Sequence, residues 1–229
     1  MKLKDFKLTP ERAAIAGNVA IIADLHLGIE NAMVEKGVSI PELQFEEVMG
    51  RTLTIIERYG VKKLVIAGDL KHEFGRNLPL EWKDVSEFLE ELSDKVDLEV
   101  VRGNHDNFLP AILAKYGLEL KEEVRIKGWK VVHGHKEVEG DRIIMGHEHP
   151  AVKIRYGGAV YSYPCFLHAR NDREILVLPA QSSLSSGTDV LTADKFLSPM
   201  LSFDMKIDVY AVEDEVYYLG ELGRLKTVV

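Results

Sequence analysis

The first half of the chain alternates short apolar runs with longer amphipathic stretches. The apolar runs lie at 19–23, 64–67 and 96–101, and they are typical of strands buried on both faces. Between them, apolar residues recur at three- and four-residue steps over 45–59 and 82–92, which predicts two amphipathic helices. This order of strand, helix, strand, helix and strand indicates a parallel sheet with right-handed crossovers.

Local signals suggest where these elements begin and end. Pro41 suits the first turn of the first helix, and Gly60 is suited to end it. The stretch 29–40 has mixed polarity and is predicted as a loop. A further short helix is predicted over 110–116, ended by Gly117.

The second half of the chain carries short apolar runs between turn residues, which predicts an antiparallel or mixed sheet. The runs lie at 118–126, 129–132, 142–145, 151–155, 159–163, 174–178, 205–212 and 215–219. The serine-rich stretch 181–187 is predicted as a polar, flexible loop. Together the two halves favour an α/β fold in which two packed mixed β-sheets are flanked by helices, a four-layer αββα sandwich.

Composition narrows the classes of protein to which the chain can belong. Its 229 residues, 46% of them hydrophobic, predict one domain over 1–229. The net charge of -8 makes it a poor candidate for sequence-independent binding to nucleic acid or anionic lipid. The single cysteine, Cys165, excludes an intrachain disulfide. No apolar run reaches the ~18 residues of a membrane span or resembles a signal peptide, so a cytoplasmic protein without membrane association is expected.

Residues of the types that bind metals come immediately after the apolar strands. They form five clusters: Asp24/His26, Asp69, Asn104/His105/Asp106, His133/His135 and His147/His149. Because ligands in open α/β sheets bind outside the carboxyl ends of the strands, the five clusters point to one crevice. Imidazole and carboxylate groups suit Zn, Fe, Ni or Mn rather than an iron–sulfur cluster. The spacing Asp24-x-His26 would place both side chains on one face of an extended segment.

Each cluster alone also has an ordinary structural explanation. A strand-end aspartate is commonly a cap or turn residue, and Gly103-Asn104 is common turn chemistry. Such explanations would have to hold five times independently, with a glycine beside nearly every cluster. The set as a whole therefore favours a functional site.

Together the five clusters resemble the signature of calcineurin-like metallophosphoesterases. The matching segments, between residues 24 and 149, are Asp24-x-His26, Gly68-Asp69, Gly103-Asn104-His105-Asp106, His133-Gly134-His135 and Gly146-His147-x-His149. In more detail, the chain is similar to small archaeal proteins related to the SbcD nuclease subunit and to bacterial phosphoesterases associated with DNA ligase. Leu178-Pro179-Ala180, followed by the Ser/Gly-rich stretch, looks like the tail of that group.

The resemblance implies a centre of two divalent transition-metal ions, with Mn favoured and Fe, Ni or Zn as alternatives. It assigns one ion to Asp24, His26, Asp69 and His149, and the other to Asp69, Asn104, His133 and His147, so that Asp69 bridges the two. His133 and His135 compete for one ligand position, and His133 is preferred because it directly follows the strand. His105 would protonate the leaving group, with Asp106 orienting it and keeping it protonated.

The activity that the resemblance implies is phosphodiester hydrolysis. Two ions ~3.5–4 Å apart can hold a bridging hydroxide for attack and clamp the phosphoryl oxygens. The expected substrates are small phosphodiesters, nucleotides or single-stranded nucleic acid. Duplex DNA is disfavoured because the basic residues of the last third are scattered among acids: Lys153, Arg155, Arg170, Arg173 and Lys195.

Three alternatives remain open. The chain could be a DNA-repair nuclease or nuclease subunit, which its acidic charge disfavours as an independent DNA binder. It could be a phosphomonoesterase or nucleotidase, since the same ligands suit either ester. It could also be a metal-free interaction module, which the complete ligand set disfavours.

Four further residues either line the crevice or lie on a solvated surface: His72, His135, Arg76 and Arg102.

Overall fold

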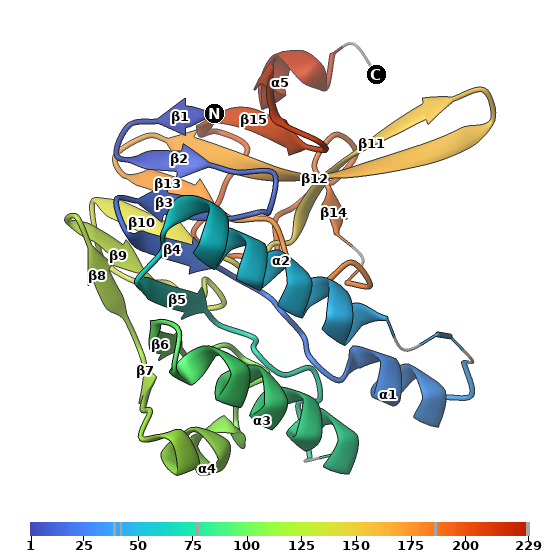
Figure 1. Cartoon of the computed structure of the whole chain (residues 1–229). Coiled ribbons are helices and arrows are strands. Elements are labelled where there is room, and N and C mark those ends of the chain that lie inside the picture. The colour runs from blue at the N-terminus through green and yellow to red at the C-terminus, as the bar shows by residue number, and fades with distance from the viewer. Residues whose placement is uncertain (39, 42, 77, 186, 228–229) are drawn as a thin grey trace.

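Two β-sheets packed face to face form the centre of the molecule in the computed structural model (Figure 1). The structure describes residues 1–38, 40–41, 43–76, 78–185 and 187–227. Both sheets contain parallel and antiparallel pairs, and helices lie against the outer face of the first sheet. The predicted α/β class with two mixed sheets is therefore confirmed.

The first sheet has seven strands in chain order. They are β1 (Lys2–Leu3), β2 (Phe6–Leu8), β3 (Ala14–Ala16), β4 (Val19–Ile22), β5 (Lys63–Ala67), β6 (Asp97–Val101) and β7 (Leu120–Lys121). Strands β1 to β4 form an antiparallel meander, whereas β4 to β7 run parallel. The parallel arrangement of the three predicted apolar strands is confirmed.

The helices of the first half are α1 (Ile29–Glu35), α2 (Gln44–Tyr59), α3 (Pro79–Ser93) and α4 (Leu109–Leu113), with the 3-10 turn η1 (Ala114–Tyr116) after α4. The predicted loop 29–40 was wrong over α1, and α2 begins after Pro41 rather than at it. One side chain explains both differences. The Glu30 carboxylate accepts hydrogen bonds from the backbone N–H groups of Leu43 and Gln44 at 2.6 and 2.9 Å, so it ties α1 to the start of α2.

The second sheet has nine strands. They are β8 (Val124–Ile126), β9 (Trp129–Val131), β10 (Arg142–Met145), β11 (Pro150–Tyr156), β12 (Ala159–Arg170), β13 (Glu174–Val177), β14 (Thr188–Asp189), β15 (Lys206–Val212) and β16 (Val216–Glu221). The single run predicted over 118–126 is divided, because β7 joins the first sheet and β8 the second. Strand β12 is longer than the predicted 159–163, because its second half pairs with both β13 and β15.

Residues that alternate along the central strands supply two separate cores. In β5, Leu64 and Ile66 pack beneath the helices, whereas Val65 and Ala67 pack between the sheets. The expected burial on both faces is therefore confirmed. The outer face of the second sheet is covered mainly by the irregular segment 190–201 and by the short helix α5 (Leu222–Leu225). Within the described part of the chain, every helix is too short or too polar to span a bilayer.

The packing of α3 on the first sheet gives a prediction about stability. Phe88 is fully buried, whereas Leu80 on the same helix is 53% exposed. Phe88→Ala should lower the free energy of unfolding by about 3–5 kcal/mol, because it leaves a cavity, and Leu80→Ala by less than about 0.5 kcal/mol. Guanidinium unfolding in EDTA would measure both without any contribution from metal binding. Equal losses would contradict the assignment of Phe88 to the core.

Candidate metal centre

The loops that carry the five clusters lie against one another at the ends of β4, β5, β6, β9 and β10. The loop after β4 continues the pairing with the loop after β5, since the N–H groups of Asp24 and His26 donate to the carbonyls of Gly68 and Asp69 at 3.1 and 3.0 Å. The Ser182 N–H donates to the Asp24 carbonyl at 3.1 Å, so the segment that follows β13 of the second sheet joins the same site.

Among the described residues, the side chains form three groups of potential metal ligands, one of which contains histidines alone: His26, His72 and His105. Each of the other two groups contains one carboxylate. The first of these two contains Asp24, His26 and His149, and the second contains Asp69, His133 and His147, with the ligand atoms of each within 4.8 Å of one another. Asp69 Oδ2 lies 3.8 Å from His26 Nε2 and 3.3 Å from His133 Nε2. Asn104 Oδ1 lies 3.0 Å from His133 Nε2. The structure thus brings together all seven residues expected as ligands.

Several donor atoms are arranged as a metal site requires. The Nε2 atoms of His26 and His149 face each other at 3.2 Å. Asp24 Oδ1 is buried and accepts no hydrogen bond from the described residues. His133 Nδ1 lies 3.1 Å from the Ala67 carbonyl, which fixes the proton on Nδ1 and leaves Nε2 for a metal. Imidazole, carboxylate and amide donors of this kind fit divalent transition-metal ions.

Five of the seven residues expected as ligands have a left-handed backbone conformation. The φ angles are 56° for Asp24, 47° for His26, 50° for Asp69, 67° for His147 and 45° for His149. The extended conformation expected for Asp24-x-His26 was therefore wrong. Left-handed geometry costs a non-glycine residue roughly 1–2 kcal/mol, and such strain is concentrated at functional sites.

Each of the two central carboxylates divides its oxygens between the backbone and the site. Asp24 Oδ2 accepts the His147 N–H, and Asp69 Oδ1 accepts the His105 N–H, both at 2.9 Å. Glycine permits these close approaches: a Cβ on Gly103 would lie 2.0 Å from Asp69 Oδ1. The other oxygen of each carboxylate is left facing the imidazoles.

Burial and neighbouring charges shift the pKa values in this cluster in opposite directions. Burial disfavours charge on Asp24 and Asp69, but the neighbouring imidazoles outweigh it and lower both carboxyl pKa values. Burial likewise disfavours charge on His133, but Asp69 and Asp24 raise its pKa to about 9. For His26, burial prevails and lowers the pKa to about 3. A metal ion on His133 would have to displace this proton, so ion binding is coupled to proton release.

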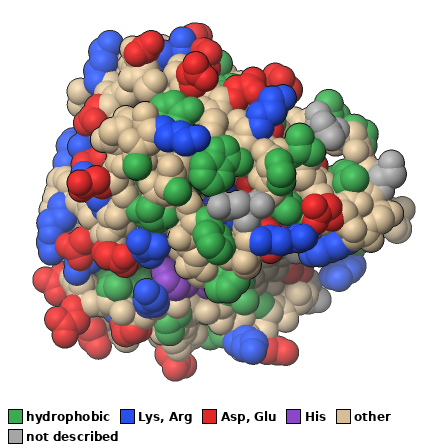
Figure 2. Space-filling model, turned by 90° about the horizontal axis from the view of Figure 1, so that it is seen from below, with side chains coloured by type: hydrophobic (Ala, Val, Ile, Leu, Met, Phe, Trp, Pro, Cys, Tyr) green, Lys and Arg blue, Asp and Glu red, His purple; other side chains and the backbone are tan. Residues whose placement is uncertain are grey.

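His105 lies at the edge of the cluster and is held by the loop after β5. Its Nδ1 contacts the His72 carbonyl, and its Nε2 is 3.9 Å from Asp69 Oδ2. The His72 ring stacks on the His105 ring with centroids 5.6 Å apart, and His72 Nδ1 is 3.4 Å from His26 Nδ1. His72, which the sequence left undecided between crevice and surface, therefore belongs to the site. Figure 2 shows histidine side chains at the surface with basic side chains beside them.

Asp106 does not make the contact predicted for it. Its carboxylate is fully buried and accepts hydrogen bonds from the backbone N–H groups of Gly103 and Asp69 at 2.8 and 2.9 Å. Among the described residues it forms no hydrogen bond or ion pair with the His105 ring. Burial, followed by the charge of Asp69, raises the Asp106 pKa to about 6. The Asp106 side chain turns inward and joins the loops after β5 and β6, so a role in orienting His105 through a direct bond is not seen, and the orienting role stays a prediction.

Three buried charged side chains, the pair Lys71–Glu81 and Glu148, escaped the sequence analysis because single charges within helices and loops carry no periodic signal. Lys71 Nζ lies 3.3 Å from Glu81 Oε2 inside the protein, and Glu81 Oε1 accepts the His72 N–H at 2.8 Å. Glu148, between two ligand histidines, accepts the N–H groups of Leu197 and Ser198 at 2.8 and 3.0 Å. Both carboxylates fix loops that carry site histidines.

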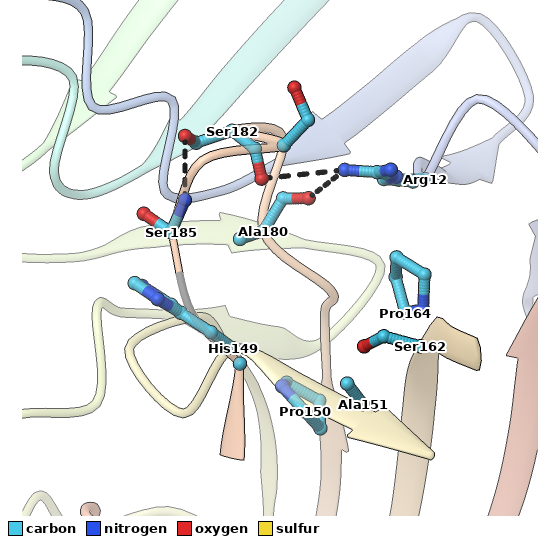
Figure 3. A pocket seen from close by; sticks show the side chains of 11 residues that line it. Arg12, His149, Pro150, Ala151, Ser162, Pro164, Ala180, Ser182 and Ser185 are labelled. Carbon is cyan, nitrogen blue, oxygen red and sulfur yellow. Dashed lines mark hydrogen bonds between the residues drawn. The ribbon is translucent and has the colours of Figure 1, made fainter. Parts of the chain in front are cut away.

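A cavity of about 280 Å³ is lined in part by His149, one of the expected ligands (Figure 3). Arg12 lies in its wall and donates through Nη1 to the carbonyls of Ala180 and Ser182 at 2.9 and 3.5 Å. The stretch 181–187 was predicted as a flexible loop, but its first two residues, Gln181 and Ser182, are buried. Gln181 Nε2 donates to the carbonyl of Arg12 at 3.1 Å; Ser186 lies outside the described residues.

Comparisons with known proteins agree with this arrangement. A family model described as calcineurin-like phosphoesterase matches residues 17–176. No curated protein matches the sequence. The fold is similar to that of the Pseudomonas putida nuclease MPE, with 18% sequence identity, a TM-score of 0.67 and 92% of each chain covered. The E. coli phosphoesterase YfcE aligns at 19% identity and a TM-score of 0.41, over 86% of this chain and 88% of its own. All five clusters lie within the matched residues, and the chain belongs to the calcineurin-like phosphoesterase family.

Proposed function

We propose that the protein hydrolyses phosphodiesters at a centre of two divalent metal ions. The observation that carries this proposal is that one histidine from each carboxylate-containing ligand group faces Asp69 Oδ2, His26 at 3.8 Å and His133 at 3.3 Å. His105 Nε2 lies 3.9 Å from the same oxygen. Family membership supports metal-dependent phosphoester hydrolysis. The preference for diesters rests on the resemblance to SbcD-related proteins and on the similar fold of a protein described as a nuclease.

The residues divide into ligands and a proton donor. Mn²⁺ is the favoured ion, with Fe, Ni or Zn as alternatives, and the ligands would be Asp24, His26, Asp69 and His149 for one ion and Asp69, Asn104, His133 and His147 for the other. When bound, such ions lower the pKa of a water molecule toward ~7 and neutralise the phosphoryl oxygens. The His72 carbonyl holds His105 Nδ1, which leaves Nε2 directed at the site to protonate the leaving oxygen.

The substrates we infer are small or single-stranded phosphodiesters. The chain has a net charge of -8, so the phosphate affinity for a duplex would have to come from a local concentration of Lys and Arg. In the last third of the chain, Arg170 pairs with Asp208 and Arg173 with Glu137, which removes two of the basic residues available.

The shared carboxylate predicts how metal binding responds to substitution. Asp69→Asn should lower the affinity for both ions by more than ~10-fold, whereas His149→Ala should lower the affinity mainly for one of them. His135→Ala is the matched control, because His135 is next to His133 in the same loop but belongs to neither ligand group. Calorimetric titration with Mn²⁺ and elemental analysis would measure affinity and stoichiometry. Saturation at one ion per chain would rule out the dinuclear centre, and no binding at all would favour the interaction module.

The position of His105 predicts a dependence on the leaving group. His105→Ala should retain the metal ions and lower kcat for alkyl phosphodiesters by roughly 10²–10⁴-fold, because an alkoxide needs a proton to leave. The loss should be much smaller for nitrophenyl esters, whose anion leaves unprotonated. Phe74→Ala is the control, since the exposed Phe74 ring is 6.0 Å from the His105 ring. Equal losses with both leaving groups would remove His105 as the acid.

A substrate panel with Mn²⁺ tests the reaction class directly. We expect bis(p-nitrophenyl) phosphate to be hydrolysed faster than p-nitrophenyl phosphate, and a cyclic nucleotide or single-stranded oligonucleotide faster than linear duplex DNA. The specific activity of the same preparation on each compound is the measurement. Fastest turnover of the monoester would replace the diester assignment with a phosphatase or nucleotidase, and duplex cleavage at comparable rates would support an independent nuclease.

A further inference from the structure

Strands β11 and β12 extend past the second sheet as a two-stranded ribbon (Figure 1, upper right). The ribbon begins directly after the ligand His149, and its outer half is exposed from Ile154 to Ser162. A projecting ribbon with large exposed side chains has no role in packing the described core. Its position beside the metal centre suggests a role in binding substrate.

The strand register assigns the ribbon's side chains to two faces, because directly paired residues share a face. The pairs Ala151↔Pro164, Lys153↔Ser162 and Arg155↔Val160 lie on one side, which we call the basic face. The pairs Ile154↔Tyr161 and Tyr156↔Ala159 lie on the other side, which we call the tyrosine face. Lys153 and Arg155, scattered in the sequence among acids, therefore point the same way, about 6.6 Å apart along the strand.

The basic face continues into the cavity beside the metal centre. Three of its members, Ala151, Ser162 and Pro164, line that cavity together with Arg12 and His149 (Figure 3). One surface therefore runs from His149, past a half-buried arginine and a serine hydroxyl, to two basic side chains.

The two basic side chains of the ribbon are not paired with neighbouring carboxylates. Among the described residues, neither Lys153 nor Arg155 forms an ion pair. The carboxylate of Asp189, on the neighbouring strand β14, accepts the backbone N–H of Lys153 at 3.4 Å and the Thr192 hydroxyl at 2.9 Å.

Two guanidinium groups lie near one side of the cavity: Arg12 in its wall, and Arg51 outside that wall. Arg51 donates to the Gln181 carbonyl at 2.5 Å, close to Arg12, which bonds the carbonyls on either side of Gln181. Burial, together with repulsion from Arg51, lowers the Arg12 pKa to about 10. Glu47 is the acidic group whose charge opposes this effect. Glu47 also accepts the hydroxyl of Ser183, which lines the cavity. The two guanidinium groups outnumber this carboxylate, which favours an anion beside Arg12.

We propose that the cavity and the basic face form a track for the sugar–phosphate backbone of single-stranded nucleic acid, which binds the phosphates adjoining the scissile one. This inference rests on the proposed function and identifies its substrate class. A single line of cations on one narrow ribbon matches one backbone, whereas a duplex presents two. Binding of this kind is independent of base sequence and sensitive to salt.

The test compares the wild type with Lys153→Ser/Arg155→Ser. Fluorescence anisotropy with a labelled oligothymidylate of about 12 nucleotides would measure Kd between 50 and 300 mM salt, with the protein as purified and the oligonucleotide checked for integrity afterwards. The variant should bind more weakly, and the slope of log K against log salt should fall by about 1.4, or ~0.7 for each lost phosphate contact. Lys2→Ser/Lys7→Ser, a cross-strand pair on β1 and β2, is the charge-matched control and should bind as the wild type does.

Activity supplies the second measurement. The ribbon variant should raise KM for the oligonucleotide and leave kcat/KM for bis(p-nitrophenyl) phosphate unchanged, because that diester is too small to reach Lys153. The track is refuted by an unchanged slope, by an equal loss in the control variant, or by size-exclusion chromatography showing that the ribbon variant changes only self-association. If the wild type hydrolyses no diester, the proposed function fails, and the anisotropy result still decides whether the track binds nucleic acid.

Discussion

Two buried carboxylates at the ends of adjacent parallel strands impose the constraint that the rest of the site satisfies. Asp24 and Asp69 are almost entirely excluded from solvent, and burying an isolated carboxylate costs several kcal/mol unless charge and hydrogen bonds compensate. Each carboxylate accepts one backbone N–H from a ligand-bearing loop and directs its remaining oxygen toward imidazoles. Because these bonds hold the loops close together, the carboxylates that would bind metal also determine the shape of the site.

Buried polar groups, together with the packing of Leu25, Leu27 and Leu70 in the core, hold these loops in their strained conformations. The two glutamines of the chain both take part: Gln44 Nε2 donates to the Leu25 carbonyl at 2.7 Å, and Gln181 Nε2 donates to the Glu11 carbonyl at 2.9 Å. Asp106 joins the loops after β5 and β6, and Glu81, paired with Lys71, holds the loop that carries His72. Left-handed backbones persist only where surrounding contacts over-determine them. The supporting residues should therefore matter for the position of the ligands as much as for stability.

The central strands and the gathering of the ligands could be predicted, because continuous apolar runs mark strands buried on both faces and parallel strands end on the same side. The remaining features depend on contacts distant in sequence. Helix α1 is set by Glu30 binding the start of α2, and β12 is extended by its pairing with β15. Asp106 adjoins His105 in sequence but turns into the protein, so its neighbour in the chain was a poor guide to its partners. The backbone conformation of Asp24 likewise could not be predicted from the sequence, since spacing alone does not distinguish extended from left-handed residues.

Net charge and local charge lead to different conclusions about nucleic acid, and the screening length decides between them. At physiological ionic strength the Debye length is about 8 Å, so the excess acidic charge of the chain acts weakly on a ribbon that projects from the body. Lys153 and Arg155 then dominate the field at their own face, while bound ions would dominate at the other end of the track. A nucleic-acid strand bound by the ribbon at one end of the track and by the metal ions at the other would be positioned through its sugar–phosphate backbone. On the proposed function, the distance from the ribbon to Asp69 would therefore select which phosphodiester is cleaved, with little dependence on the bases.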